Sequence, residues 1–169
     1  MVAGLIVSVG GFAVKTVTAK QKVTQEQIQR LIRHVNRKDW WHVPPADPHA
    51  YERRGKFFAS SFREAEFYGR PLDNPERVVI TKPLIGNEHE IANVLGVPGQ
   101  REGMGLEEIA EHDALWRNAA IKRGFDCIIL MTAKAFLEFQ TSGKIPRSLE
   151  LNVVDLRCLG AAKSPLCKY

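Results

Sequence analysis

Residues 55–68 read GKFFASSFREAEFY, and the character of the sequence changes halfway along this stretch. Residues 55–59 are rich in aromatic side chains, as is typical of a short β-strand. A polar turn and a helical pattern follow, and this pattern ends with a further aromatic residue, Tyr68. We therefore expect an aromatic strand, a tight turn and a short helix that returns a ring to the neighbourhood of the strand. Such an arrangement forms a slot for a flat ring.

The helix in this stretch has signals for both of its ends. Ser61 and Glu64 have capping-box spacing, in which each side chain accepts a hydrogen bond from the other residue's backbone N–H, so the helix is expected to begin near Phe62. Gly69 is able to adopt a left-handed conformation at the other end, and Pro71 cannot continue a helix. The expected helix is therefore about two turns long.

Length and composition predict one domain. The chain has 169 residues, of which 44% are hydrophobic and 25% are charged, and this is an ordinary globular composition. We assign residues 24–169 to a single domain and residues 1–23 to an apolar and basic N-terminal segment. The cysteines Cys127, Cys158 and Cys167 are odd in number and widely spaced. The sequence thus predicts free thiols in a reducing compartment rather than a disulfide framework or a zinc site.

The first fourteen residues are almost wholly apolar, with a break at Gly10-Gly11. This run is shorter than the roughly 20 residues that cross a bilayer, and it lacks the positively charged start of a secretion signal. A buried strand or turn is the favoured interpretation, and with it a cytoplasmic protein. Lys15 lies at the edge where an anchor or a weak signal sequence would end. A secreted protein, or one anchored in a membrane through residues 1–14, is the open alternative.

The positive charge of the chain is concentrated near its start. Residues 15–38 hold seven Lys or Arg residues and one acidic residue, Glu26, in a chain of net charge +5. Thr24 and Gln27 form a second capping-box pattern, and apolar residues recur at i, i+3, i+4 and i+7, namely Ile28, Leu31, Ile32 and Val35. Segment 24–38 is therefore expected to be a basic amphipathic helix. Its basic face is either solvated or a surface for nucleic acid, an acidic partner or an anionic membrane.

Three short blocks, taken in order, resemble motifs of one superfamily. They are the aromatic run Trp40-Trp41-His42, the strand and helix of residues 55–68, and Glu150-Leu151-Asn152-Val153-Val154-Asp155, in which a Glu opens a β-branched strand. Their order and spacing are similar to those of the ADP-ribosyltransferase superfamily, in particular its diphtheria-toxin and poly(ADP-ribose) polymerase branch. The resemblance implies an α+β domain with a split antiparallel β core and peripheral helices.

The same resemblance implies a substrate and a set of site residues. Members of this superfamily use NAD as a substrate and transfer its ADP-ribose to a macromolecule, here a protein or nucleic-acid acceptor. By this resemblance Glu150 is the catalytic carboxylate, which stabilises the oxocarbenium-like sugar as the bond to nicotinamide breaks. Phe57 and Tyr68 would enclose the nicotinamide ring. His42 would bind the adenosine-side ribose, and Val43 would offer its backbone N–H and C=O to the nicotinamide amide.

Three departures from the family pattern leave a second hypothesis open. Phe57 stands where the family has a tyrosine, and Ala65 stands where many members have a serine. After His42, where the family usually has a glycine, this chain has Val43-Pro44-Pro45. The chain is thus either a mono-ADP-ribosyltransferase or a catalytically degenerate module that binds NAD or nucleic acid. A third hypothesis is an NAD glycohydrolase, which uses water as the acceptor.

The residue two positions before the Glu distinguishes acceptors within the superfamily. Arginine-modifying members usually carry Glu or Gln there, whereas this chain has Ser148, so arginine is disfavoured as the acceptor. A rival motif, Glu138-Phe139-Gln140, lies among helix formers and leads into a Gly/Pro turn, so Glu150 is preferred. Glu88-His89-Glu90 and Glu111-His112-Asp113 resemble fragments of metal sites. Adjacent residues on a helix point apart, however, so no metal is expected.

The middle of the chain predicts further elements of the same domain. We expect a strand at 77–82, a helix at 87–95, a loop at 96–105, a helix at 106–123 and a buried strand at 125–131. The last helix, its terminal Gly124 and the strand that opens with Phe125-Asp126 also resemble a piece of the superfamily that precedes the catalytic strand.

Overall fold

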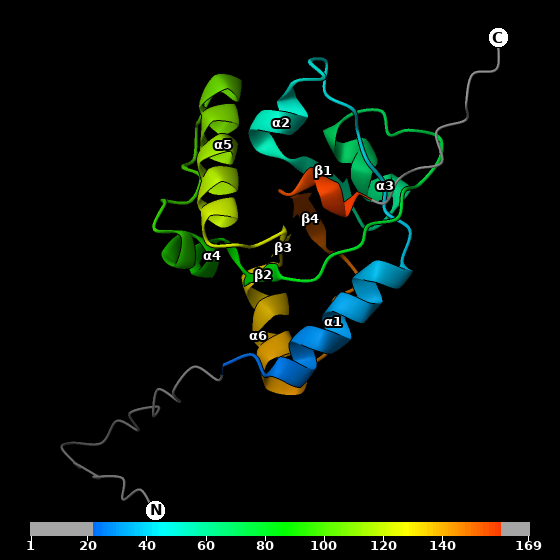
Figure 1. Cartoon of the computed structure of the whole chain (residues 1–169), viewed down its shortest axis with the longest axis vertical. Coiled ribbons are helices and arrows are strands. Elements are labelled where there is room, and N and C mark those ends of the chain that lie inside the picture. Colours follow the sequence, from blue (N-terminus) through cyan, green and yellow to red (C-terminus); the bar gives the residue numbers. More distant parts are fainter. Residues whose placement is uncertain (1–21, 160–169) are drawn as a thin grey trace, which may run out of the picture.

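Four short strands form a mixed sheet at the centre of the molecule. The computed structural model describes residues 22–159. The strands are β1 (Lys56–Ala59), β2 (Pro83–Gly86), β3 (Cys127–Leu130) and β4 (Glu150–Val153). Their order across the sheet is β1-β4-β3-β2, and Figure 1 shows them between the surrounding helices. Strand β4 is antiparallel to both β1 and β3, whereas β2 and β3 are parallel.

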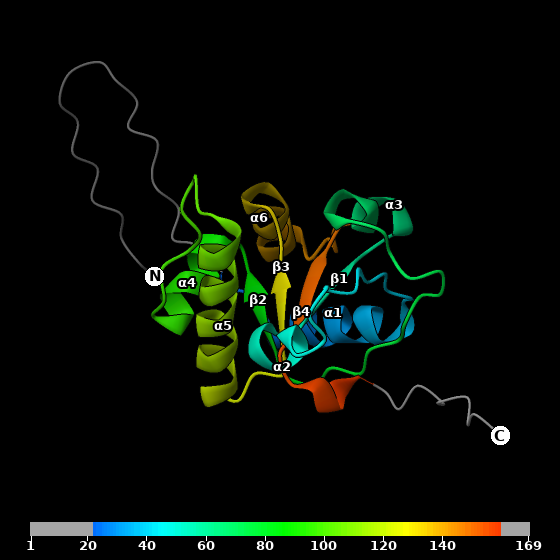
Figure 2. The ribbon, with the colours of Figure 1, turned by 90° about the horizontal axis from the view of Figure 1, so that it is seen from above.

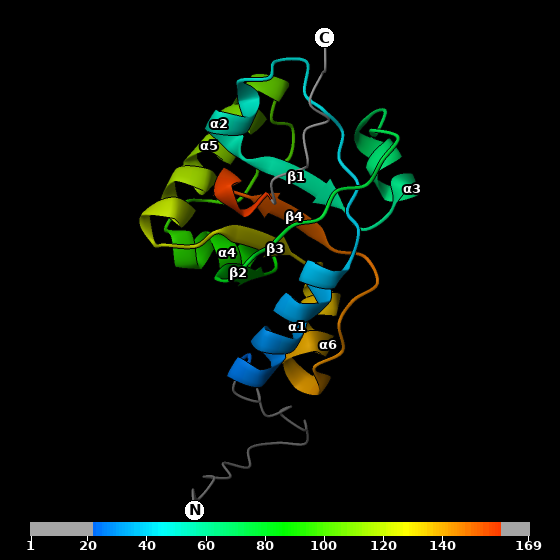
Figure 3. The ribbon, with the colours of Figure 1, turned by 45° about the vertical axis from the view of Figure 1, so that its right-hand side comes forward.

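One face of the sheet packs on α1 (Gln25–Arg37) and α6 (Ala133–Ser142), which lie side by side in Figure 3. The apolar stripe predicted for the basic helix is its buried face, because Leu31, Ile32 and Val35 all join the core. The Thr24–Gln27 capping box is also present. The amphipathic helix predicted at 24–38 is therefore confirmed.

The other face packs on α4 (Glu88–Leu95) and α5 (Leu106–Lys122), which Figure 2 shows across the sheet from α1. Trp116 of α5 is the largest side chain in the core on this side. Both helices begin and end close to the predicted residues. Asn87 caps the start of α4, and Gly96 ends it in the left-handed conformation.

The aromatic strand and helix of residues 55–68 also form as predicted. Strand β1 is followed by α3 (Phe62–Ala65), and a single 3₁₀ turn, η1 (Glu66–Tyr68), completes the expected second turn. The Ser61 hydroxyl accepts a hydrogen bond from the backbone N–H of Glu64 over 3.3 Å. At the end of η1, Gly69 has φ +143°, and a Cβ there would lie 2.9 Å from Cγ1 of Val43, so no other residue fits without strain.

The strand predicted at 77–82 is wrong, because β2 begins only at Pro83. Distant side chains bind the backbone N–H groups that a strand would use. Asn36 Oδ1 accepts from the N–H of Ile80 over 2.9 Å, and Asp126 Oδ2 accepts from those of Thr81 and Lys82 over 2.6 and 2.9 Å. Residues in this segment form only isolated bridges, such as Val78 with Leu159. The predicted split antiparallel core is present only in part, since β4 is antiparallel to β1 and β3 whereas β2 and β3 are parallel.

The remaining predictions concern the N-terminus and the cysteines. Residues 1–14 and Cys167 lie outside the described residues, as does nearly all of the segment 1–23. Cys127 is a buried free thiol and Cys158 is a half-buried one. Within the part of the chain that the structure describes, no helix is long and apolar enough to cross a membrane.

Candidate functional site

Tyr68 and Glu150 are 82 residues apart in the sequence and are hydrogen-bonded to each other. Glu150 is the first residue of β4, at the end of the sheet where β1 leads into α3, and its side chain is exposed. Tyr68 ends η1 and donates its hydroxyl hydrogen to Oε1 of Glu150. The predicted catalytic carboxylate and one of the two predicted ring residues therefore meet at one place.

Phe57 lies on the same face of the sheet as Glu150. The pairing of β1 with β4 places Phe57 opposite Asn152 and Ala59 opposite Glu150. Side chains two residues apart on a strand share a face, so the ring and the carboxylate are diagonal neighbours, roughly 7–8 Å apart at their Cα atoms. Phe57 is 43% exposed, so one side of its ring is open to a ligand.

Val43 lies beside the same turn. Its Cγ1 approaches Gly69, the residue directly after Tyr68, and the backbone carbonyl of the preceding residue, His42, accepts a hydrogen bond from the N–H of Leu72 over 3.0 Å. The 41–43 segment is thus held against the chain that leaves η1.

The imidazole of His42 lies behind β1 rather than on the face that carries Glu150. It is buried against the ring of Phe58, which alternates with Phe57 and so points to the opposite face. Its Nδ1 hydrogen-bonds the backbone carbonyl of Phe57 over 2.7 Å, and its Nε2 hydrogen-bonds the hydroxyl of Tyr51 over 2.7 Å. Burial lowers the pKa of His42 below its ordinary value. His42 is therefore a neutral side chain in the folded protein, and its hydrogen bond to the backbone of Phe57 holds β1 in place.

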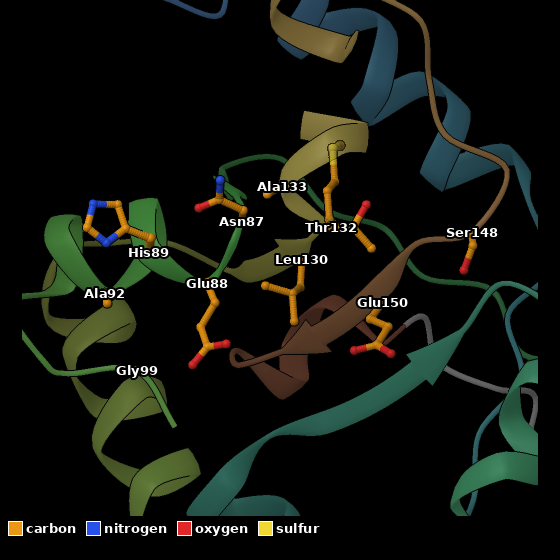
Figure 4. Close-up of a pocket in the computed structure, with 11 residues that line it drawn as sticks. Asn87, Glu88, His89, Ala92, Gly99, Leu130, Thr132, Ala133, Ser148 and Glu150 are labelled. Carbon is orange, nitrogen blue, oxygen red and sulfur yellow. The ribbon is translucent and has the colours of Figure 1, made fainter. Parts of the chain in front are cut away.

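A cavity of about 650 Å³ opens beside Glu150, within the usual size range of ligand pockets. Figure 4 shows Glu88 and Glu150 on opposite sides of Leu130, with both carboxylates extending from the ribbon in the same direction. The N-terminal caps of two helices, Asn87 of α4 and Thr132 of α6, also line this cavity. Helix N-termini favour negatively charged groups, because their first N–H groups are free and the helix dipole is positive there.

The electrostatic surroundings of Tyr68 keep its hydroxyl protonated. Partial burial raises the pKa of Tyr68, and the hydrogen bond to Glu150 together with the negative charges of Glu150 and Glu64 raises it further. The phenol therefore acts as a hydrogen-bond donor and holds the Glu150 carboxylate in a defined orientation.

Of three other residues that the sequence singled out, Ser148 lines the cavity, whereas Ala65 and Glu138 do not. Ser148 lines the cavity near Glu150, as its position two residues earlier predicts. Ala65 is 1% exposed and belongs to the core, so this position contributes no side chain to the cavity. Glu138 of α6 forms an ion pair with Lys144 over 3.1 Å and does not line the cavity.

Sequence reasoning missed Glu88 and the caps Asn87 and Thr132 as cavity residues. The two caps do carry a local signal, since each directly precedes a helical pattern. Among residues 22–159, no three His, Cys, Asp or Glu side chains are arranged to hold a metal ion. Comparisons of the chain with protein-family models, with curated proteins and with solved structures found no match.

Proposed function

We propose that this protein binds NAD and transfers ADP-ribose from it to a macromolecular acceptor. The observation that carries the proposal is that Glu150 is hydrogen-bonded to Tyr68 and shares one face of the sheet with the exposed residue Phe57. An ADP-ribosyltransferase-like fold is part of the proposal. The pairing of β1 with β4, which brings the aromatic strand beside the strand that Glu150 opens, supports it.

The residues present fit a nicotinamide dinucleotide. The exposed residue Phe57 offers a stacking surface. The cavity of about 650 Å³, whose lining includes Glu150 but neither Phe57 nor Tyr68, has room for a ligand of this class. The helix caps Asn87 and Thr132 suit the pyrophosphate, while Glu88 and Ser148 offer hydrogen-bonding partners for ribose hydroxyls.

In the proposed reaction, the bond between C1′ of the ribose and the pyridinium nitrogen breaks, and its electron pair leaves with neutral nicotinamide. Positive charge develops on the sugar, and the carboxylate of Glu150 stabilises it. The acceptor atom then bonds to C1′ and loses a proton to a carboxylate or to water. Tyr68 acts as a positioning residue through its hydrogen bond to Glu150.

The first test compares NAD consumption by the wild-type protein and by Glu150→Gln, measured as nicotinamide release. We expect the variant to lose at least about 100-fold in rate, because the amide cannot stabilise the developing charge. Folding should be little changed, since Glu150 is exposed. Glu102→Gln, a change at another exposed glutamate, serves as the matched control and should keep the wild-type rate.

Two results would contradict the proposal. One is an unchanged rate in Glu150→Gln, and the other is a wild-type protein that neither binds nor consumes NAD. The second result would favour the catalytically degenerate module, to which Phe57, without the tyrosine hydroxyl of the family pattern, already points. Release of ADP-ribose into water alone, with no labelled acceptor, would instead favour the NAD glycohydrolase.

A further inference from the structure

The exposed side of α1 carries a stripe of positive charge. Arg30, Arg33, His34 and Arg37 recur at i, i+3, i+4 and i+7, two positions after the apolar residues that face the core. Together with Lys38 and Ile145 they line a groove of about 390 Å³. At 1.5 Å per residue the stripe rises roughly 10 Å along the helix, so it presents a row of cations rather than one point charge.

The cations of this groove are not neutralised by the protein. Among the described residues, none of the four Lys and Arg side chains forms an ion pair with an acidic side chain. Arg30 donates instead to the backbone carbonyl of Gly143, which is uncharged. The charge of Glu64 acts on Lys38 at one end of the groove. Most of the positive charge of the stripe is therefore available to an anionic partner.

One segment connects this groove to the cavity beside Glu150. The chain leaves α6 at Gly143, which Arg30 binds, and Ile145 then lines the basic groove. Ser148 and Glu150, a few residues later, line the cavity. Glu150 comes five positions after Ile145, so the two residues lie at most about 18 Å apart along this segment. Arg147, which is exposed, adds a further positive charge between them.

Exposed aromatic rings lie beside the same carboxylate. Tyr68, the last residue of η1, is hydrogen-bonded to Glu150, and the charge of Glu64 in the adjoining α3 acts on both Lys38 and Tyr68. Phe67 is 92% exposed and Tyr68 is 65% exposed, and their ring centroids are 6.3 Å apart. Exposed rings of this kind are stacking surfaces for unpaired nucleobases, whereas an acidic peptide or a lipid headgroup has no flat ring to place there.

We propose that the basic groove of α1 and the exposed rings of η1 together bind single-stranded nucleic acid, with phosphates on the α1 stripe and bases on the rings of Phe67 and Tyr68. We further propose that the bound strand is the acceptor of ADP-ribose, a step that rests on the proposed function above. A nucleophilic oxygen or nitrogen of the strand bonds to C1′ of the NAD ribose as the bond to nicotinamide breaks. Nicotinamide leaves with the electron pair, and the acceptor atom loses its proton to Glu150 or to water.

Binding is tested with fluorescently labelled 16-nucleotide strands of one mixed sequence, as DNA and as RNA, by fluorescence anisotropy. If the four cations each neutralise one phosphate, log K falls with log salt at a slope of about −2.8, and raising salt from 50 to 200 mM weakens binding roughly 50-fold. The DNA and RNA arms show which sugar is preferred. A duplex should bind more weakly than either strand, because its bases are already stacked.

The double variant Arg33→Gln, Arg37→Gln removes two of these cations. Both side chains are exposed, so circular dichroism should be unchanged, while the slope should fall to about −1.4. The matched control is Lys122→Gln, Arg123→Gln, which removes two exposed cations at the end of α5 and should keep the wild-type slope. Phe67→Ala should weaken binding at least about fivefold at any salt concentration.

The inference is overturned if the two double variants lose affinity equally. It is also overturned if a polyglutamate peptide or phosphatidylserine vesicles bind the groove as tightly as the strands do, since a generic anion site or a membrane surface would then explain the charge.

Transfer is tested with NAD labelled in its adenylate phosphate and with the same strands, and label on the strand is the expected result. NAD consumption without any binding or labelling of a strand would overturn this inference and leave the proposed function in place. Strand binding without NAD consumption would overturn the acceptor role and the proposed function, and the nucleic-acid surface alone would stand.

Discussion

At the scale of single residues, the surroundings of a side chain decide its chemistry, and His42 is the clearest case. The motif around it led us to expect that His42 binds the adenosine-side ribose of NAD. In the folded protein both of its ring nitrogens bond to groups of the protein, the carbonyl of Phe57 and the hydroxyl of Tyr51. With both nitrogens engaged, His42 orders the strand that carries Phe57, and its contribution to NAD binding is expected to be indirect.

The burial of His42 predicts that acid destabilises the protein. Its folded-state pKa is lowered, so between about pH 6.5 and that lower pKa the unfolded chain binds a proton that the folded chain does not. The free energy of unfolding should therefore fall as pH drops from 7 to 5, by at most about 1.4 kcal/mol per pH unit from this residue. Urea unfolding of the wild type and of His42→Gln at pH 7, 6 and 5 measures the effect.

We expect His42→Gln to be less stable than the wild type at pH 7 and to show a flatter dependence on pH. His49→Gln is the control, since it removes a histidine that is exposed. Parallel curves for the wild type and His42→Gln would show that His42 does not titrate as proposed.

At the scale of elements, the register of β1 against β4 depends on the residue that precedes β1. Gly55 has φ +83° and ends helix α2 (Ala50–Arg54), where its backbone N–H donates to the carbonyl of Tyr51. A Cβ at this position would collide with Oδ1 of Asn152 and lie 2.8 Å from the backbone oxygen of Val153. The amide of Asn152 in turn donates to the carbonyl of Arg54 over 3.0 Å. This close approach supports the register that pairs Phe57 with Asn152 and Ala59 with Glu150.

Gly55→Ala should therefore destabilise the protein more than a positive φ alone requires. Gly103 provides a matched control, since it also has φ +83° but no atom lies within 4 Å of a Cβ built there. We expect Gly103→Ala to cost about 1–2 kcal/mol from the backbone conformation, and Gly55→Ala to cost at least about 2 kcal/mol more from the collision with β4. Urea unfolding at pH 7 compares the two variants. Equal losses of unfolding free energy would mean that β4 shifts to accommodate the methyl group.

At the scale of the whole molecule, the candidate site draws on parts of the chain that are far apart in the sequence. Phe57, Tyr68, Glu88 and Glu150 come from β1, η1, α4 and β4, and the helices on the two faces of the sheet hold these elements together. A ligand that contacts several of them binds only the folded chain. Binding is therefore expected to stabilise the whole protein.

If NAD binds at this site, it should raise the melting temperature in a concentration-dependent way. At a concentration one hundred times its Kd, the added free energy of unfolding is about 2.7 kcal/mol. Phe57→Ala should lose most of this shift through loss of the stacking surface, whereas Glu102→Gln should keep it. Differential scanning fluorimetry with increasing NAD makes the comparison, and an equal shift in Phe57→Ala would place NAD elsewhere.

Sequence reasoning predicted the features that depend on short-range interactions and missed those that depend on contacts between distant residues. The ends of α1, α3 and α4 were predictable because caps such as Thr24 and terminal glycines such as Gly96 act within one turn of the helix. The strand at 77–82 was not predictable, because Asn36 and Asp126, each about 45 residues away, bind its backbone. The presence of Tyr68 and Glu150 at one site was expected only by resemblance to a family, and their hydrogen bond was not predicted, since no local pattern links them.

Local order in this protein, namely its helices, their caps and the aromatic strand before α3, follows from the amino-acid sequence, since each signal acts over only a few residues. Only tertiary structure decided that Glu88 shares a cavity with Glu150, that His42 is turned away from it, and that the basic groove of α1 lies one short segment away. These outcomes depend on strand register and helix packing, where contacts between distant residues determine which side chains meet.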